Sequence, residues 1–266
     1  MCDTTVTKAA LLAAVTGIVR ETEALPATET RWGVPLLGIA DSRDPGFAQL
    51  KTLIDPMHAL PSDVLPDARA VVSYYIPFLP DTAAANRGGT VASPGWARAY
   101  EETNAMFAAI NRTLLALLSA AGYTGAVPAQ AQVFNREKIV SYWSQRHIAR
   151  LAGLGTFGRN NMLITTAGCC GRFNSIVTNA PLPADSIVSG ERCLNKSSGK
   201  CGACFRACPS GALTPDGFDR HKCLAACKEN AKLYRAFGAS YGDAKTGSEV
   251  CGKCVCGMPC AFRIPG

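Results

Sequence analysis

Apolar residues recur with two different periods along the first part of the chain, and these periods predict alternating helices and strands. Ala, Leu and Val recur at helical spacing over residues 4–23, and a stripe with the same spacing runs through residues 96–121. Residues 70–78 form a short apolar run rich in β-branched side chains, which is typical of a buried strand. The same criteria predict a further helix over 138–151 and further strands over 32–40, 162–165 and 174–178.

Prolines and glycines interrupt this pattern and indicate how the chain is divided. Residues 56–66 contain three prolines and residues 80–94 are polar with two adjacent glycines, so both stretches are expected to be loops. Residues 181–183 read Pro-Leu-Pro, and after them the periodic pattern gives way to cysteine, glycine and short turns. We therefore expect an α/β domain over residues 1–185, followed by a smaller module over residues 186–266.

The composition supports a folded core and directs attention to the second part of the chain. The 266 residues are 48% hydrophobic, which is enough for a sizeable core. Of the thirteen cysteines, Cys2 stands alone and the other twelve lie between residues 169 and 260. A disulfide framework suits small secreted domains, whereas tight C-x2-C spacings in a long chain favour a metal site.

Charge and hydropathy exclude two classes of partner. The formal charge of +7 comes from scattered basic residues rather than a Lys/Arg tract. Cysteines that bind a metal do so as negatively charged thiolates, which would offset part of this charge. No nucleic-acid partner is therefore expected. No apolar stretch reaches the roughly 18 residues that cross a membrane. The apolar residues 9–19 are followed at once by Arg20 and Glu21, which favours an amphipathic helix over an export signal. We expect a soluble, cytoplasmic protein.

The order of the cysteines is the most specific motif in the sequence. Cys201, Cys204 and Cys208 form a C-x2-C-x3-C-P run that resembles half of a bacterial two-cluster ferredoxin motif. In that motif the cysteine before proline binds the other cluster. The resemblance implies two [4Fe-4S] clusters, the first held by Cys193, Cys201, Cys204 and Cys260, and the second by Cys208, Cys223, Cys251 and Cys254.

The other cysteines have no place in this scheme. Cys169 and Cys170 are adjacent and are expected to be buried thiols, with a substrate-facing or redox-active role as the alternative. Cys227 and Cys256 lie within the module, and Cys256 competes with Cys254 and Cys260 as a cluster ligand.

A glycine-rich segment invites a nucleotide-binding interpretation that we reject. Gly153, Gly155 and Gly158 match G-x-G-x-x-G, but the dinucleotide fingerprint needs a strand before it, a helix after it and an acidic residue about twenty positions on. None of these is predicted here. The glycines are expected instead to end a helix and to let the backbone approach a flat ligand closely.

Two segments are similar to epoxyqueuosine reductase. Residues 152–160, AGLGTFGRN, resemble the AGLGWIGKN segment of that family, and residues 168–182 resemble its GS-x5-E-I-L-T-D-x-P-L segment. The resemblance implies a nitroreductase-like cobalamin domain joined to a two-cluster ferredoxin module, as also in reductive dehalogenases. It implies base-off cobalamin above the clusters. The cofactor-binding residues that it suggests are Gly153, Gly155, Gly158, Arg159, Asn160, Gly168 and Thr178.

The sequence departs from that family at several positions. Ile139 stands where the family has its proton-donating aspartate, with Glu137 as the nearest acid, and Ser175 stands where it has a glutamate. Seven residues separate Cys193 from Cys201 where the family has two, and the chain stops at Gly266, before the tRNA-binding helical tail. We interpret the chain as a paralogue that keeps the electron path and the cobalamin pocket but has lost the tRNA chemistry, since epoxide reduction needs a proton donor.

Three functional hypotheses remain open. The first is an anaerobe-type, cobalamin-dependent iron–sulfur reductase that receives electrons from ferredoxin or flavodoxin and acts on a small molecule. Tyr100, Tyr142 and His147 are its candidate pocket groups, although core packing explains the tyrosines equally well and a surface or capping role is favoured for His58, His147 and His221. The others are an electron carrier without cobalamin, and a flavin-binding iron–sulfur reductase.

Overall fold

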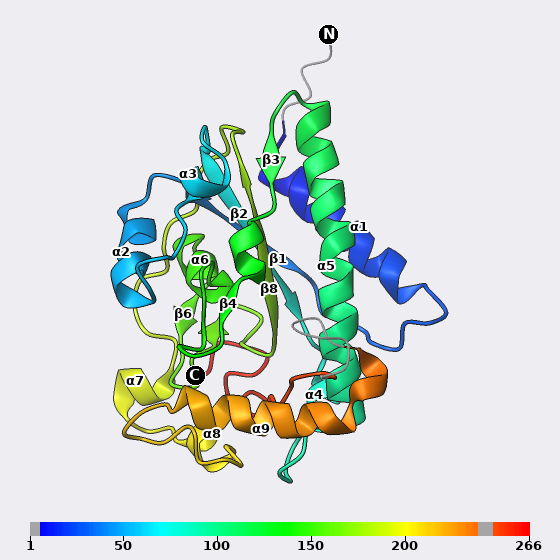
Figure 1. The fold of residues 1–266 in the computed structure, drawn as a ribbon, viewed down its shortest axis with the longest axis vertical. Coiled ribbons are helices and arrows are strands. Elements are labelled where there is room, and N and C mark those ends of the chain that lie inside the picture. The colour runs from blue at the N-terminus through cyan, green and yellow to red at the C-terminus, as the bar shows by residue number, and fades with distance from the viewer. Residues whose placement is uncertain (1–5, 239–246) are drawn as a thin grey trace.

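The computed structural model describes residues 6–238 and 247–266 and is built around a central antiparallel sheet (Figure 1). Its strands are β1 (Leu36–Asp41), β2 (Ala70–Pro77), β8 (Gly171–Thr178) and β3 (Gly125–Ala126), in the order β1-β2-β8-β3. β2 pairs with β8 along its whole length, from Ala70 opposite Thr178 to Pro77 opposite Gly171. These paired strands form the rigid centre that positions the site at one of their ends.

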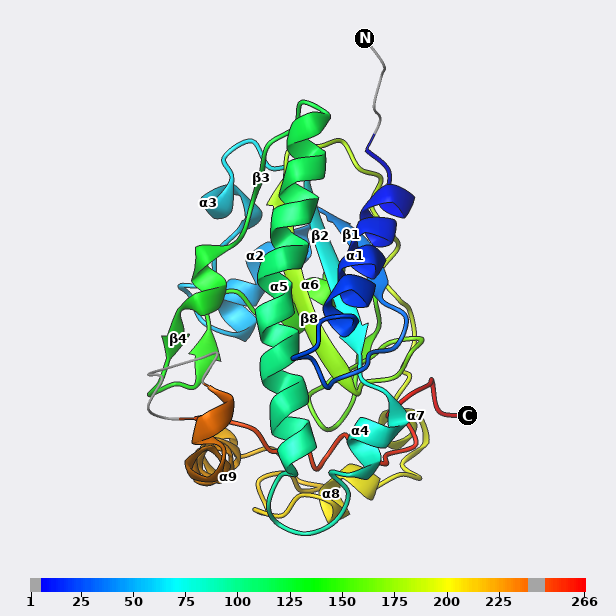
Figure 2. The ribbon, with the colours of Figure 1, turned by 90° about the vertical axis from the view of Figure 1, so that its right-hand side faces the viewer.

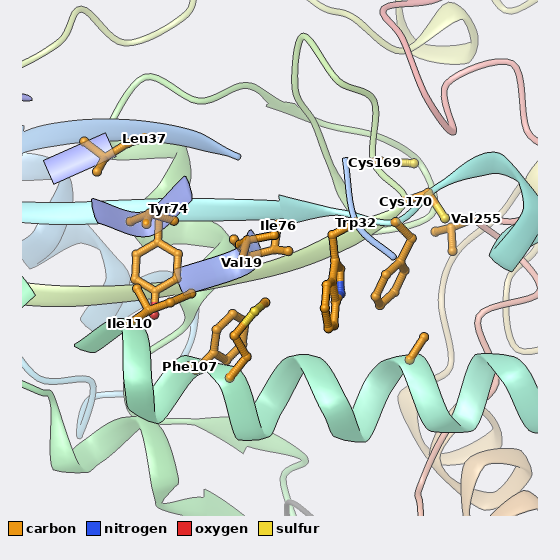
Figure 3. Close-up of a cluster of buried hydrophobic side chains, with 14 of the residues drawn as sticks. Val19, Trp32, Leu37, Tyr74, Ile76, Phe107, Ile110, Cys169, Cys170 and Val255 are labelled. Atoms are coloured by element: carbon orange, nitrogen blue, oxygen red, sulfur yellow. The ribbon is translucent and has the colours of Figure 1, made fainter. Parts of the chain in front are cut away.

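Two helices, α1 (Lys8–Glu23) and α5 (Pro94–Ala120), cover one face of the sheet (Figure 2). Successive side chains of a strand point to opposite faces, so Val72, Tyr74 and Ile76 of β2 meet Ile110 and other apolar residues of α5 (Figure 3). α5 starts where the Ser93 hydroxyl accepts a hydrogen bond from the Trp96 amide. The lower half of this long helix extends beyond the sheet toward the cysteine-rich segments (Figure 2).

The other face of the sheet is covered by α2 (Pro45–Leu53), α3 (Pro61–Val64) and α6 (Gln145–Leu151). Phe47, Trp143 and Ile148 are fully buried there against Val71 and Val177. Helices on both faces make a three-layer mixed α/β structure, in agreement with the predicted mixture of helices and strands.

Short elements surround the end of the sheet where β2 finishes and β8 begins. They are α4 (Pro80–Ala84), the 3-10 helix η1 (Ala129–Gln132), the hairpin of β4 (Phe134–Asn135) and β5 (Val140–Ser141), and the hairpin of β6 (Thr156–Phe157) and β7 (Leu163–Ile164).

The C-terminal segments pack against this same end. They contain α7 (Leu194–Ser198), α8 (Ala203–Arg206), α9 (Arg220–Leu233) and the 3-10 helix η2 (Arg235–Phe237). Val250, Val255 and Ala261 belong to the same buried cluster as the sheet and α5. The boundary expected near residue 185 therefore coincides with no break in the core, and the division into two domains stays a prediction.

Several sequence expectations are met. The helix over 4–23 is present as α1, with residues 4 and 5 outside the described residues, and those over 96–121 and 70–78 appear as α5 and β2. The strands expected over 32–40, 162–165 and 174–178 appear as β1, β7 and β8 with shifted ends. No helix in the described ranges is long and apolar enough to cross a membrane.

The helix predicted over 138–151 is wrong in its first half. Residues 140–141 form β5, and helix α6 begins only at Gln145. Ile139 has a φ of +54°, which no helix permits, and the Ser141 hydroxyl accepts from the Trp143 amide. The polar stretch 80–94 also contains the short helix α4, and the turn-rich module contains the unpredicted helix α9.

Candidate functional site: two cysteine groups below a cavity

The first expected cluster set is gathered in one place. Cys193, Cys201, Cys204 and Cys260 line a common small cavity. Burial raises the pKa of Cys204 to about 11, and the nearby Cys260, Cys193 and Cys201 thiols add to this rise. Crowded thiolates repel one another, and an iron–sulfur core would remove that cost because it binds thiolates directly. The donor set therefore fits a cluster.

The second set is gathered separately. Cys208, Cys223, Cys251 and Cys254 line the floor of a larger cavity of about 750 Å³, and Cys227 lines it as well. Burial raises the pKa of Cys254, and Cys251, Cys223 and Cys208 are its next strongest influences. The amide of Leu213 donates a hydrogen bond to the Cys208 sulfur at 3.4 Å. Cys208 thus lies with the second group although it follows Cys204 closely in sequence, as the crossed ferredoxin-like arrangement requires.

Among the residues that the structure describes, no group of three or more His, Cys, Asp or Glu side chains is arranged for a single metal ion.

The remaining described cysteines each lie beside another cysteine. The Cys169 and Cys260 sulfurs are 3.8 Å apart, the Cys170 and Cys256 thiols are hydrogen-bonded, and so are those of Cys223 and Cys227. Cys169 and Cys170 are fully buried at the end of the hydrophobic cluster, close to Val255 (Figure 3). Cys2 lies outside the described residues.

Asn160 connects the two cysteine groups. Its side chain is buried and lines both cavities. The Asn160 amide nitrogen donates to the carbonyl of Cys254 at 3.2 Å and lies 3.7 Å from the Cys169 sulfur. Its side-chain oxygen accepts from the Met162 amide. Asn160 is therefore shared by the walls of the two cavities.

The glycine-rich segment is enclosed by the protein's own backbone. It lies between helix α6 and the β6–β7 hairpin, as predicted. A Cβ added at Gly155 would lie 2.2 Å from the Ile164 carbonyl, and one at Gly153 would lie 2.5 Å from the Ser186 carbonyl. Neither residue lines the large cavity. The space beside these two glycines is therefore filled by the backbone of neighbouring segments of the chain. Contact between the glycines and a flat ligand stays a prediction.

The other residues suggested by the resemblance are dispersed. Arg159 donates to the Pro215 carbonyl and lies over the Phe205 ring, so it holds the cysteine-rich segment. Gly168 lies against Ala261, and the following amides donate to Cys260 and Ala261. Thr178 lies at the opposite end of β8, where its hydroxyl donates to the Thr124 carbonyl.

The predicted pocket groups divide between the cavity and its surroundings. Tyr100 and His147 line the large cavity, whereas Tyr142 accepts a hydrogen bond from Asn135 and does not line it. Burial and the nearby Arg146 charge lower the pKa of His147 to about 4, so its ring is neutral at pH 7. The expectation of a surface histidine is wrong for His58, which is fully buried and accepts from the Ser144 amide. The half-buried His147 shares a hydrogen bond with Ser144, the N-cap residue of α6.

Two arginines of the cavity were not singled out from the sequence. Arg146 lies on α6 and Arg172 on β8. Burial and then the positive charge of Arg172 lower the pKa of Arg146, and Arg146 in turn helps to lower the pKa of Cys223 to about 7. The signal that could have found Arg172 is a charged residue inside a strand that is otherwise buried.

Comparison with known proteins supports the resemblance. No family model matches the chain. The epoxyqueuosine reductases of Aliivibrio fischeri and Bacillus anthracis are 31% and 34% identical over 83 and 84 residues, which are 30% and 31% of this chain but only 21% and 20% of theirs. That of Salmonella typhimurium is 28% identical over 64% of this chain and 42% of its own length. The matches thus span well under two thirds of these relatives.

Solved structures agree at the level of the fold. An epoxyqueuosine reductase from Bacillus subtilis superposes with a TM-score of 0.54 and 17% identity, over 96% of this chain and 67% of that chain. A catabolic reductive dehalogenase superposes with a TM-score of 0.56 and 18% identity, over 86% and 30%. The predicted similarity to these families is confirmed, and these homologues are reductase enzymes. The ferredoxin-like architecture of residues 186–266 stays a prediction.

Proposed function

We propose that this protein is an iron–sulfur oxidoreductase that passes low-potential electrons through two [4Fe-4S] clusters to a cobalamin, which reduces a small-molecule substrate. The observation that carries the proposal is the sorting of eight cysteines into two groups, one of which forms the floor of a 750 Å³ cavity. Cys193, Cys201, Cys204 and Cys260 would hold one cluster, and Cys208, Cys223, Cys251 and Cys254 the other.

The residues of the chain support this arrangement in distinct ways. The clusters, when bound, supply single-electron storage, and the corrinoid supplies a strongly reducing metal centre. Cys193 and its three partners line a separate small cavity, which suits a first cluster that receives electrons from an external ferredoxin or flavodoxin. Arg146 stabilises the thiolate of Cys223. His147 lines the cavity and shares a hydrogen bond with Ser144 through its Nδ1.

The wall of the cavity favours a substrate other than an epoxide. Ile139, at the position of the family's acid, lines the cavity and offers no proton. Tyr100, which also lines the cavity, is then the candidate proton donor. A substrate that contains epoxyqueuosine, the nucleoside in the relatives' name, is the second candidate, supported by the sequence matches to epoxyqueuosine reductases.

One experiment tests the proposal. The chain is purified and reconstituted anaerobically with iron and sulfide, then titrated with hydroxocobalamin while absorbance and heat are recorded. We expect about eight irons per chain, as two four-iron clusters require, and saturable cobalamin binding with a spectral shift. Eight irons with no response to any cobalamin would favour the electron carrier, and co-purified flavin bands would favour the flavin reductase. About four irons would show that one cysteine set is wrongly assigned.

A further inference from the structure

Arg172 is an unusual residue for its position. It lies on β8 opposite Ile76, beside Gly171, and its side chain lines the large cavity. The guanidinium carbon is 3.9 Å from the centroid of the Tyr100 ring. Its Nε is buried and has no hydrogen-bond partner. A buried donor without a partner costs about 1–3 kcal/mol, so a group that accepts from it on binding would recover that energy.

The positive charge of the cavity is not balanced by carboxylates. In the described part of the chain, no ion pair involves Arg172 or Arg146. Glu249 lines the cavity, but its carboxylate lies 3.8 Å from the Arg136 guanidinium.

The two arginines differ in what already engages them. Arg146 donates to the Asn161 carbonyl at 2.6 Å and lies 3.5 Å from the Met162 sulfur. Arg172 has the Tyr100 ring on one side, and its buried Nε has no hydrogen-bond partner among the described residues. A planar guanidinium held against an aromatic ring keeps its donors in a fixed fork, which matches the geometry of an oxyanion.

We propose that Arg172 is the recognition residue for an oxyanion group, carboxylate or phosphate, on an otherwise apolar organic substrate. This inference rests on the proposed function and names the chemical class of its substrate. Phe78, Trp96 and Ile139 line the same cavity and provide the apolar wall for the body of the molecule. Arg146, close enough to repel Arg172, strengthens the attraction for an anion. The oxyanion end would fix the orientation of the substrate above the cysteine floor.

The test measures binding rather than turnover. The full chain, reconstituted with its clusters, is titrated by calorimetry with benzoate, with neutral benzamide of nearly the same shape, and with inorganic phosphate. We expect benzoate to bind at least about tenfold more tightly than benzamide, because a hydrogen bond to a charged group is worth about 1.5–3 kcal/mol. Arg172→Gln should abolish that preference, and Arg172→Lys should keep part of it.

The matched control is Arg43→Gln, since Arg43 is exposed and remote from the cavity lining. Equal binding of benzoate and benzamide by a wild type that also fails to bind phosphate, or an unchanged preference in Arg172→Gln, would overturn the proposal. Phosphate binding that Arg172→Gln removes would support the oxyanion site and identify phosphate as the source. No binding of either anion would also overturn it.

Two further measurements separate this proposal from the proposed function. Arg172→Gln should keep the wild-type iron content, urea midpoint and cobalamin spectral shift, so that a loss of benzoate preference reports on recognition alone. The titrations are run with and without hydroxocobalamin. Failure of the wild type to bind cobalamin would contradict the proposed function, while the comparison of benzoate with benzamide would still decide the role of Arg172.

Discussion

At the scale of single residues, His147 connects the cavity to the pH dependence of stability. Its pKa of about 4 lies below the ordinary 6.5, mainly because the ring is buried. Between these values the unfolded chain binds more protons than the folded one, so stability is present above pH 6.5 and is lost as pH falls toward 4. The full effect is about 3 kcal/mol.

The free energy of unfolding should fall between pH 7.5 and 5.5 in both the wild type and His147→Gln, as measured by urea unfolding. We expect this fall to be about 1 kcal/mol smaller in His147→Gln than in the wild type. Burial also lowers the pKa of His58. His58 should therefore account for part of the pH dependence of stability that remains in His147→Gln. His221→Gln is the control because this residue is exposed on α9. If the free energy of unfolding of His147→Gln changed with pH as much as that of the wild type, the prediction would be contradicted.

Cys223 and Cys227 lie one turn apart on α9, and only one of them is needed in the second set. The hydrogen bond from the Cys227 thiol and the charge of Arg146 lower the pKa of Cys223 to about 7. The same hydrogen bond raises the pKa of Cys227. The thiolate is the metal ligand, so Cys223 is the favoured one. We expect Cys223→Ser to lose about half of the iron, one of two clusters, and Cys227→Ser to keep nearly all of it. Loss of iron in Cys227→Ser but not in Cys223→Ser would show that Cys227, one helical turn further along α9, is the cluster ligand.

At the scale of elements, long periodic segments were predictable and locally determined ones were not. Helix α5 and strand β2 were predicted because burial on one or both faces imposes a clear period. Helix α9 was missed because it buries only Asn230 and Ala231, so its polar sequence shows no apolar stripe. The two cysteine groups were expected from the resemblance of their spacing to a two-cluster ferredoxin motif, whereas Arg172 enters the cavity through strand pairing, which a single sequence does not display.

The β4–β5 hairpin contains the strained residue that defeated the helix prediction. Ile139 has a φ of +54° between the two strands, and a left-handed conformation costs a residue with a Cβ about 1–2 kcal/mol. Ile139→Gly should therefore be more stable than Ile139→Ala by about 1 kcal/mol, the opposite of the order found in helices. Both variants remove the same side-chain contacts, so the comparison isolates the backbone. Equal urea midpoints for the two would show that the hairpin relaxes.

At the scale of the whole molecule, the sheet and the cysteine-rich segments are parts of one packed structure. The Cys169 and Cys170 amides donate to Cys260 and Ala261, and Lys8 and Asp185 form an ion pair at 2.6 Å across the start of the C-terminal part. The cavity lies where these parts meet, with its floor from the C-terminal segments and its walls from α5, α6 and β8. Cofactor chemistry placed there is enclosed by both halves of the chain.

This architecture also predicts which reductant the protein does not use. A dinucleotide would need its pyrophosphate at a glycine turn between a strand and the N-terminus of a helix. Here Gly153 and Gly155 follow helix α6 and precede β6, Gly158 lies between β6 and β7, and Gly155 is packed against the Ile164 carbonyl. We expect NADH or NADPH alone to leave the visible absorbance of the reconstituted clusters unchanged under anaerobic conditions. Dithionite, or reduced ferredoxin supplied with its reductase, should bleach the same sample, which controls for competent clusters. Direct bleaching by NADH with no other protein present would mean that a nucleotide site exists elsewhere in the chain and that the external electron carrier is not required.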